Sequence, residues 1–420
     1  MKKVRILALL FFALLLVAAL VSCGEKGGDS AATGEESASE ETTGDTYSVT
    51  TEEEAPPVPA SEGLAFLSNG DETCTLTGIG VCKDKEIVIP SKAENGDRVT
   101  SIANEAFRKL TNVTGVIIPN DVTSIGNYAF GACSGLTSIT IGNGVTRIGQ
   151  GAFSKCNALT SVTIGNGVAM IGDYAFNQCS NLNSLTIPNS VTTIGDAAFN
   201  GCSNLTSVTV GIGVTSIGSD AFSGCSKLNR ATVPANVISS LPKSQLQTVV
   251  ILNGTIPNHA FEDCANLTSV TIQNGVIGIG QAAFMRCSGL TSITIPSSVI
   301  SIGSNAFDEC SGLTSVTIDE GVTDIGAAFQ HCSKLTSIVI PNSVTSIGAG
   351  AFNSCKQLTS VTIGNGVTRI GSWAFLACSK LTSITFQGTQ ARWNAITKDR
   401  EWDSETGKYT VYCTDGNITK

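Results

Sequence analysis

The segment LTSVTIGNGVTRIGSWAFLACSK, residues 358–380, contains every feature from which the fold can be predicted. Its first fourteen residues nearly duplicate LTSITIGNGVTRIG at 136–149. Alignment on the phenylalanine of the Ala-Phe pair gives copies at positions 107, 130, 153, 176, 199, 222, 261, 284, 307, 329, 352 and 375. The steps are 23 residues, except for one of 39 and one of 22. Such a fixed period indicates a repeat protein in which each unit packs on its neighbours.

Each part of the unit predicts one piece of a coil. LTSVTI (358–363) alternates apolar and hydroxyl residues, which is typical of a short strand with its apolar side inward. The Gly-Asn-Gly that follows predicts a turn, and Val367 with Ile370 forms a second inward pair, which predicts a short second strand. The spacing AF-x-x-C predicts a tight helical turn that places Phe375 and Cys378 on one side. One coil cannot bury these side chains alone, but stacked coils can.

We therefore predict an α/β-type solenoid with one parallel sheet of about 13 strands, short second strands and helical turns, capped at both ends. The repeats occupy 107–390 and are irregular at 228–266, where one coil lacks AF-x-x-C and causes the step of 39. The step of 22 is a deletion in IGAAF (325–329) that a loop can absorb. The predicted strands start at Val113, Leu136, Leu159, Leu182, Leu205, Leu228, Leu246, Leu267, Leu290, Leu313, Leu335, Leu358 and Leu381.

The ends of the repeat array differ from its units, as the ends of a solenoid must. Residues 61–106 are predicted to form an N-terminal cap that contains a β-hairpin, and residues 391–420 a C-terminal cap. We expect Trp393 and Trp402 to cover the last exposed edge of the core.

The chain begins with the features of an export signal. Residues 1–22 combine a positive start with an apolar run from Ile6 to Val21, which indicates a signal peptide. The run ends in Leu-Val-Ser-Cys at Cys23, which resembles a bacterial lipobox, so we expect Cys23 to be lipidated and to anchor the chain in the membrane. The alternative is an ordinary secretory signal followed by a chance cysteine. Residues 23–60 then predict a lipidated cysteine followed by an acidic, disordered tether.

The charge distribution bears on the class of partner. The chain carries a net charge of −9, of which the acidic tether contributes −9 and the signal peptide +3, so residues 61–420 carry −3. Binding of nucleic acid requires clustered Lys and Arg, so this balance argues against a nucleic-acid partner.

The units resemble the BspA-like leucine-rich repeats of bacteria, a class with 23-residue units. The resemblance covers residues 62–420 and includes TLTGIG (75–80), RWNAI (392–396) and TVYCTDG (410–416). It implies a curved solenoid on an exported protein of the bacterial cell envelope that is exposed at the surface and linked to adhesion and to binding of host extracellular proteins. The resemblance implies no particular residue as a binder.

Eleven cysteines recur at one position of the unit, and Leu110 occupies that position in the first unit. Because leucine is an apolar filler, we expect a column of buried free thiols. Disulfides between neighbouring coils and a metal ladder are the alternatives, but equivalent side chains in a stack point the same way, and the chain has no C-x-x-C and only two distant histidines. We predict no metal and no other cofactor. Cys74 and Cys82 differ, because they lie eight residues apart across a predicted hairpin and could form one disulfide.

Serine and threonine occupy the outward positions of the predicted strands. They are either polar residues that suit a strand or a broad contact surface for an extended protein or glycan. This candidate binding face comprises Ser138, Thr140, Ser161, Thr163, Ser184, Thr186, Ser207, Thr209, Ser269, Thr271, Ser292, Thr294, Ser315, Thr317, Ser360 and Thr362.

No GxSxG, HExxH or P-loop motif is present, and His259 and His331 lie at variable positions of the unit, so we predict no catalytic residues. The leading hypothesis is a non-enzymatic lipoprotein of the cell surface that binds an extracellular protein or glycan through its solenoid. The second is a structural spacer of the envelope without a specific ligand. The third is a binder of ice or of a glycan lattice, which curvature of the solenoid disfavours.

Overall fold

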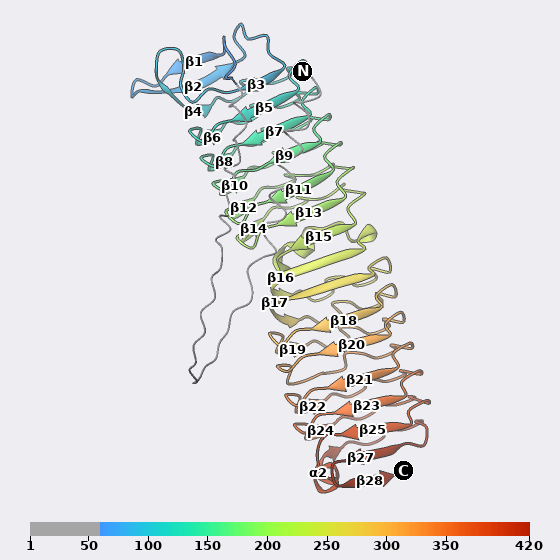
Figure 1. Ribbon diagram of the computed structural model, residues 1–420. Coiled ribbons are helices and arrows are strands. Elements are labelled where there is room, and N and C mark those ends of the chain that lie inside the picture. The colour runs from blue at the N-terminus through green and yellow to red at the C-terminus, as the bar shows by residue number, and fades with distance from the viewer. Residues whose placement is uncertain (1–58) are drawn as a thin grey trace, which may run out of the picture. The chain divides into compact units, whose positions relative to one another are not determined.

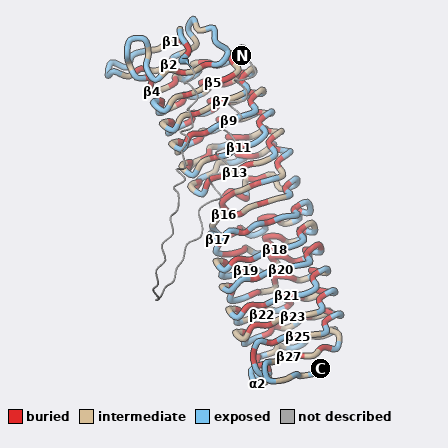
Figure 2. The backbone as a smooth tube through the Cα atoms, in the orientation of Figure 1, coloured by how far each residue is buried: buried red, intermediate tan, exposed pale blue. Residues whose placement is uncertain are grey.

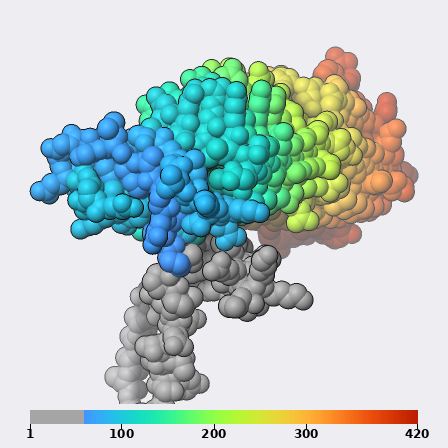
Figure 3. Space-filling model, turned by 90° about the horizontal axis from the view of Figure 1, so that it is seen from above, coloured from blue at the N-terminus to red at the C-terminus, as the bar shows by residue number. Residues whose placement is uncertain are grey.

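A computed structural model describes residues 59–420 as one stack of coils (Figure 1). The predicted signal peptide, Cys23 and the acidic tether up to residue 58 lie outside the described residues. In the space-filling view the coils follow one another in the order of the sequence, as successive bands from blue to red (Figure 3).

All thirteen predicted strands are present on one side of the stack, and each coil contributes one of them. Two further strands from the caps, β3 (Glu86–Val88) and β27 (Thr410–Cys413), extend this series. The predicted single sheet is divided into four hydrogen-bonded ladders, with interruptions between β9 and β11, β17 and β18, and β20 and β21. The thirteen are β5 (Gly115–Ile118), β7 (Ser138–Ile141), β9 (Ser161–Thr163), β11 (Ser184–Ile187), β13 (Ser207–Val210), β15 (Arg230–Val233), β16 (Thr248–Ile256), β17 (Ser269–Ile279), β18 (Ser292–Ile295), β20 (Ser315–Ile318), β21 (Ser337–Ile340), β23 (Ser360–Ile363) and β25 (Ser383–Phe386).

Short second strands line another side of the stack and pair in parallel with the next coil. In some coils the turn before the second strand requires glycine, because a Cβ on Gly144 would lie 1.7 Å from the Asn120 carbonyl oxygen of the preceding coil. Other coils carry Asp121, Ser190 or Ser298 at the same position. The second strands are β4 (Arg98–Ile102), β6 (Ser124–Ile125), β8 (Arg147–Ile148), β10 (Met170–Ile171), β12 (Thr193–Ile194), β14 (Ser216–Ile217), β19 (Ser301–Ile302), β22 (Ser346–Ile347), β24 (Arg369–Ile370) and β26 (Thr397–Lys398).

The prediction of a helical turn at AF-x-x-C is wrong. The segment does close with a tight turn, because the Cys133 N–H donates to the Phe130 carbonyl at 3.2 Å. However, Tyr128 and Ala132, two residues to either side of Phe130, have φ of 53° and 60°, in the left-handed region. The N–H groups of Tyr128, Phe130 and Ala132 donate to carbonyls of the following coil at 2.7–2.8 Å. These bonds between coils replace the bonds that a helix would make within itself.

The core consists of columns of equivalent side chains, most of them identical from coil to coil. In the backbone tube of Figure 2 the buried positions recur along the stack. The phenylalanines form two stacks of six rings, 107–222 and 261–375, with neighbouring centroids 4.9–5.7 Å apart. The predicted column of free, buried thiols is confirmed for all eleven repeat cysteines. Each of ten of these cysteines donates its S–H to a phenylalanine carbonyl of an earlier coil, as Cys156 does to Phe130 at 3.1 Å.

The irregular coil at 228–266 interrupts the phenylalanine column. Two short 3-10 helices, η1 (Ala235–Ser240) and η2 (Lys243–Gln245), replace the second strand and the AF-x-x-C turn. Val237, Ile238 and Leu241 are buried there and fill the interior that a phenylalanine occupies elsewhere.

The two ends of the stack are closed by different elements. At the N-terminal end, β1 (Ala65–Ser68) and β2 (Thr73–Gly78) form an antiparallel hairpin. At the other end, α2 (Gln390–Ala395) precedes a hairpin of β27 with β28 (Gly416–Thr419). Trp402 packs edge-on against Phe375 with ring centroids 6.1 Å apart, and Trp393 is buried beside it.

The two cysteines of the N-terminal end are not joined. Cys74 lies within β2 and faces Ser68 across the hairpin, whereas Cys82 follows β2 in a loop. The two residues therefore do not lie on opposite strands, and both are free thiols in this structure. The Sγ atom of Cys74 points toward the Asp97 carbonyl oxygen at 3.7 Å.

Candidate functional site

The candidate binding face predicted from the sequence lies on the strands of the first side. All sixteen of its hydroxyl residues occupy outward positions of β7 to β23 and are exposed or half-buried. Ser383 and Thr385 in β25 continue the row, and the same S-x-T pattern could have revealed them. Arg230 is the one charged residue at these positions on β7–β25, and Val339 is an exposed apolar exception.

Hydrogen bonding distinguishes this face from the hydroxyl residues beside it. Eight threonines that stand just before a strand donate their hydroxyl to a carbonyl of the coil before, as Thr160 Oγ1 does to the Thr137 carbonyl at 3.0 Å and Thr137 Oγ1 to the Thr114 carbonyl at 2.8 Å. Among the residues that the structure describes, no side chain or backbone group forms a hydrogen bond with any of the sixteen hydroxyls of the candidate face. Those hydroxyls are therefore free to bond to water or to a ligand.

The AF-x-x-C turns present a second surface, which the sequence analysis did not consider as a site. Three positions of each turn matter here, the two residues after the phenylalanine and the residue two before it. Most of these residues are exposed or half-buried, whereas some, such as Gly131, Gly151 and Asp308, are buried. These positions differ from unit to unit, and in the second half of the stack they carry acids and histidines.

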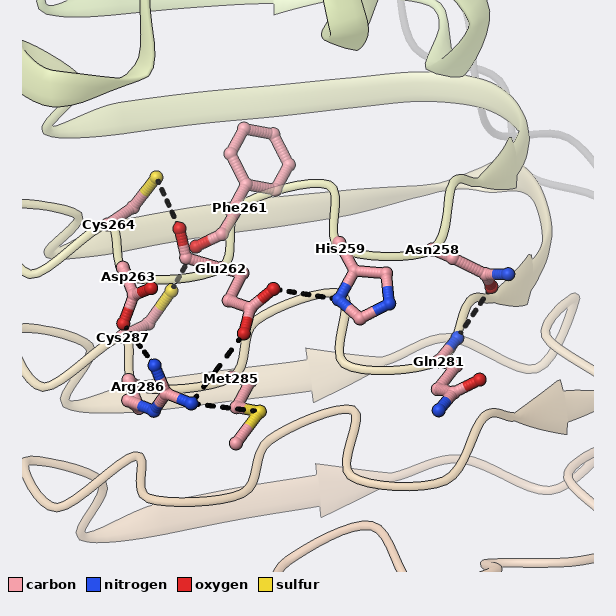
Figure 4. Close-up of polar contacts among 10 residues, drawn as sticks. All are labelled: Asn258, His259, Phe261, Glu262, Asp263, Cys264, Gln281, Met285, Arg286 and Cys287. Atoms are coloured by element: carbon pink, nitrogen blue, oxygen red, sulfur yellow. Dashed lines mark hydrogen bonds and ion pairs between the residues drawn. The ribbon is translucent and has the colours of Figure 1, made fainter.

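Arg286 lies 2.8 Å from Asp263 and 3.7 Å from Glu262, and His259 lies 2.7 Å from Glu262. Figure 4 shows these side chains and their contacts. Glu309, in the following coil, lies 3.9 Å from Arg286.

This acidic cluster forms a network of ion pairs around Arg286. The hydrogen bond that Arg286 donates to Asp263 raises the pKa of the Arg286 guanidinium above its ordinary value, so Arg286 stays charged. The second histidine, His331, lies one coil beyond Glu309 at the same position of its turn, and its Nδ1 is 2.8 Å from Oδ1 of the buried Asp308. Within residues 59–420, no group of three or more His, Cys, Asp or Glu side chains is arranged to hold a metal ion.

The repeat thiols are unsuited to nucleophilic chemistry, because reactive cysteines need a lowered pKa and access to solvent. Desolvation by burial raises the pKa of Cys133 to about 11 and the pKa values of Cys179, Cys310 and Cys378 to about 12. They serve as small apolar core residues.

In the first half of the stack the same turn positions enclose a shallow depression of about 360 Å³. Its wall includes three cationic side chains, two tyrosines and an asparagine, namely Arg108, Lys109, Lys155, Tyr128, Tyr174 and Asn177. Alignment of the repeat units could have placed these residues in adjacent coils. The predicted helical turn, however, would have pointed their side chains in other directions.

The comparison with protein families gives one match. A model described as the BspA type leucine rich repeat region matches the chain in six copies, over residues 100–229 and 254–382, which is more than half of its length. A search of curated proteins found no match.

Several solved structures of bacterial repeat proteins are similar to this chain. A leucine rich cell surface protein from Faecalibacterium prausnitzii is 29% identical, with 82% of this chain and 98% of the other covered and a TM-score of 0.34. A leucine-rich repeat protein from Bacteroides ovatus is 26% identical, with 85% and 100% covered and a TM-score of 0.39. No helix of residues 59–420 is both long enough and apolar enough to span a bilayer.

Proposed function

Because this chain belongs to the BspA-type leucine-rich repeat family, we propose that it is a non-enzymatic, lipid-anchored protein of the bacterial cell surface that binds an extracellular protein or glycan. The ligand lies along the candidate binding face of outward serines and threonines. Cys23 carries the acyl chains, and each buried methylene contributes about 0.8 kcal/mol to anchoring.

One observation supports the position proposed for the binding face. Eight threonines just before the strands donate their hydroxyls to carbonyls of the preceding coil, whereas the sixteen hydroxyls of the candidate face have no partner among the described residues. A row of free hydroxyls spaced by about 4.8 Å from coil to coil can offer a ligand many hydrogen bonds, each worth about 0.5–1.5 kcal/mol.

The expected affinity of one molecule is low. The face lacks the tryptophan and tyrosine anchors that usually dominate a tight protein interface, and Arg230 is its one cation on β7–β25. Lipid anchoring places many copies on one surface, and multivalent contact then strengthens adhesion without any new contact within one complex.

The experiment uses the chain from residue 24, titrated onto immobilised extracellular-matrix proteins and glycans. The test variant combines Ser184→Glu, Ser207→Glu and Ser269→Glu on the candidate face. The control combines Ser226→Glu, Ser288→Glu and Ser311→Glu, three exposed positions in the turns that give the same change in net charge.

Saturable binding that the test variant loses and the control variant keeps is the expected result. Binding that both variants keep would place the ligand elsewhere on the chain. If no ligand of the panel binds and deletion of the protein disturbs the envelope, the function is that of a structural spacer and the proposal is wrong.

A further inference from the structure

We propose that the depression in the first half of the stack is a binding site for an anionic glycan, with an acidic pyranose between its tyrosines and its lysines. The depression lies on the AF-x-x-C turns, whereas the proposed binding face lies on the strands. This inference depends on the proposed function in one respect: an extracellular location exposes the protein to glycans.

The hollow arises from small residues in one coil between large ones in its neighbours. Lys109, Ala132 and Lys155 occupy the same position in three consecutive turns, each in the left-handed conformation with φ of 60–65°. Gly131 lies next to Ala132 in the middle coil, opposite Arg108 in the coil before. The residues at the bottom of the depression therefore have small side chains or none. The two lysines lie two coils apart, which is about 10 Å at the usual spacing of strands.

The tyrosines come from the other left-handed position of the turn. Tyr128 and Tyr174 have φ of 53° and 56°, a conformation that bulky residues rarely adopt. Between them lies Gly151, on which a Cβ would lie 2.3 Å from Cε1 of Tyr128, so the Tyr128 ring extends over this glycine. The exposed ring of Tyr174 follows in the next coil. Two aromatic rings thus border the depression on a surface built mostly of small polar residues.

The cations of the depression are available to an anion. Lys109 and Lys155 are exposed and form no ion pair with any residue between 59 and 420. Arg108 is held in place, because its Nη1 lies 2.5 Å from Oε1 of Glu105 and its guanidinium carbon lies 5.3 Å from the centre of the Tyr128 ring. With Glu105 included, the site keeps a net charge of +2.

These groups match the chemistry of an acidic sugar. The ring of Tyr174 offers a flat apolar surface to the C–H face of a pyranose, and the lysines pair with its carboxylate or sulfate. Asn177 and Ser154 provide polar groups for sugar hydroxyls. A nucleic-acid site would need a longer row of cations than the three found here.

The test measures binding of the chain from residue 24 to three oligosaccharides, one with carboxylates only (hyaluronan), one with sulfates (heparin) and one neutral (dextran). The first variant is Lys109→Ala with Lys155→Ala. Alanine is tolerated in this conformation, because Ala132 and Ala377 adopt it at the same position of other turns. The charge-matched control is Lys334→Ala with Lys356→Ala, two exposed lysines of later coils.

Two further variants probe the aromatic side. Tyr174→Ala removes one ring, and Ala197 and Ala282 show that alanine fits there with positive φ. Gly151→Ala removes no contact group, but its Cβ would displace the Tyr128 ring.

We expect the chain to bind hyaluronan, heparin or both, and not dextran. Loss of two charged contacts should weaken binding by about tenfold or more, and loss of one stacking ring by about fivefold. Gly151→Ala should weaken binding as Tyr174→Ala does, and the lysine control should leave it unchanged.

Three results would overturn the proposal: no binding of either acidic oligosaccharide at millimolar concentration, equal loss in the lysine control, or equally tight binding of a DNA oligonucleotide of the same charge. The Ser→Glu variant of the strand face should still bind the acidic sugar. Loss of matrix binding alone therefore tests the proposed function, and loss of sugar binding alone tests this site.

Discussion

The two stacks of phenylalanines, 107–222 and 261–375, have the same interior and opposite surfaces. In each, six parallel rings stack at centroid distances near 5 Å beside a column of buried thiols. On the turns of the first stack the exposed residues include Arg108, Lys109 and Lys155, with two tyrosines. On the turns of the second they include Glu262, Asp263 and Glu309 around Arg286, and two histidines.

This contrast separates what determines the fold from what determines recognition. An inward residue touches its own copy in the coils before and after, so one change of size disturbs three coils. In the 23-residue units, a residue two before or two after the phenylalanine has to tolerate a positive φ, but the chemistry of its side chain can vary from unit to unit. Differences in chemistry between coils therefore accumulate at the turns, and the following predictions test whether the two interiors are equivalent while the two surfaces differ.

The largest expected effect is loss of stability in alkaline solution. In the unfolded chain the thiols titrate near pH 9, whereas burial raises the pKa of Cys133 to about 11 and those of Cys179, Cys310 and Cys378 to about 12. A raised pKa stabilises the folded state at pH values below 9, and this stabilisation declines as the pH rises toward the folded values. Between pH 8 and 10 each thiol should lower the unfolding free energy by about 1.3 kcal/mol, so these four alone lower it by about 5 kcal/mol.

Urea unfolding under reducing conditions at pH 8 and pH 10, followed by hydrogen exchange and mass spectrometry, measures this effect in each stack separately. Both stacks should lose protection over the same pH window. Loss in one stack only would show that the two thiol columns differ in burial.

The second prediction concerns the rings. Phe153→Ala and Phe307→Ala, one in the middle of each stack, should each destabilise the chain by about 3–5 kcal/mol, because each leaves a cavity between two neighbouring rings. Leu241→Ala, in the irregular coil between the stacks, should cost about 2–3 kcal/mol, because this position is slightly exposed. Chemical denaturation of the three variants gives the comparison. A difference of more than about 1 kcal/mol between the two phenylalanine variants would contradict the equivalence of the interiors.

The sequence predicts the interior well, because a side chain that meets its own copies must repeat. The twelve phenylalanines, the thirteen strands and the buried thiols all follow from the 23-residue period. The conformation of the turn does not follow, because a spacing of three between Phe130 and Cys133 fits a helical turn and a β-turn equally. The conformation of the turn is determined by the hydrogen bond that the Phe130 N–H donates. Its acceptor is the Ala152 carbonyl of the next coil and not a carbonyl of its own coil.

The same limit explains what could be predicted of the sites. The hydroxyl face was predicted because it lies on strands, whose alternation fixes which residues point outward. The depression was missed, because a helical turn gives Lys109 and Lys155 other directions than the left-handed residues that the structure contains. The sequence spacing suggests a hairpin between Cys74 and Cys82, whereas the hairpin in the structure is formed by β1 and β2.

The third prediction compares two neighbouring hydroxyls of one coil. Thr160→Val removes the hydrogen bond to the Thr137 carbonyl, which is 3.0 Å long, and should destabilise the chain by about 1 kcal/mol. Ser161→Ala removes a hydroxyl that has no partner among the described residues, so the change should lie within about 0.5 kcal/mol. Thermal unfolding of both variants measures the difference. A cost for Ser161→Ala equal to that of Thr160→Val would mean that the hydroxyl face is structural and not free for a ligand.

The smallest expected effect distinguishes the two surfaces. Lys155 and Arg286 occupy the same position of their turns, with φ of 60° and 57°, so replacement of either by alanine places the same strain on the backbone. Arg286→Ala leaves Glu262, Asp263 and Glu309 without their shared cation, and their mutual repulsion should lower the Tm slightly. Lys155→Ala removes no ion pair and should leave the Tm unchanged. Added salt should reduce the deficit of Arg286→Ala, because screening weakens the repulsion. A Tm deficit that persists in high salt would indicate that Arg286 acts through packing, and the contrast between a basic and an acidic surface would then have no energetic basis.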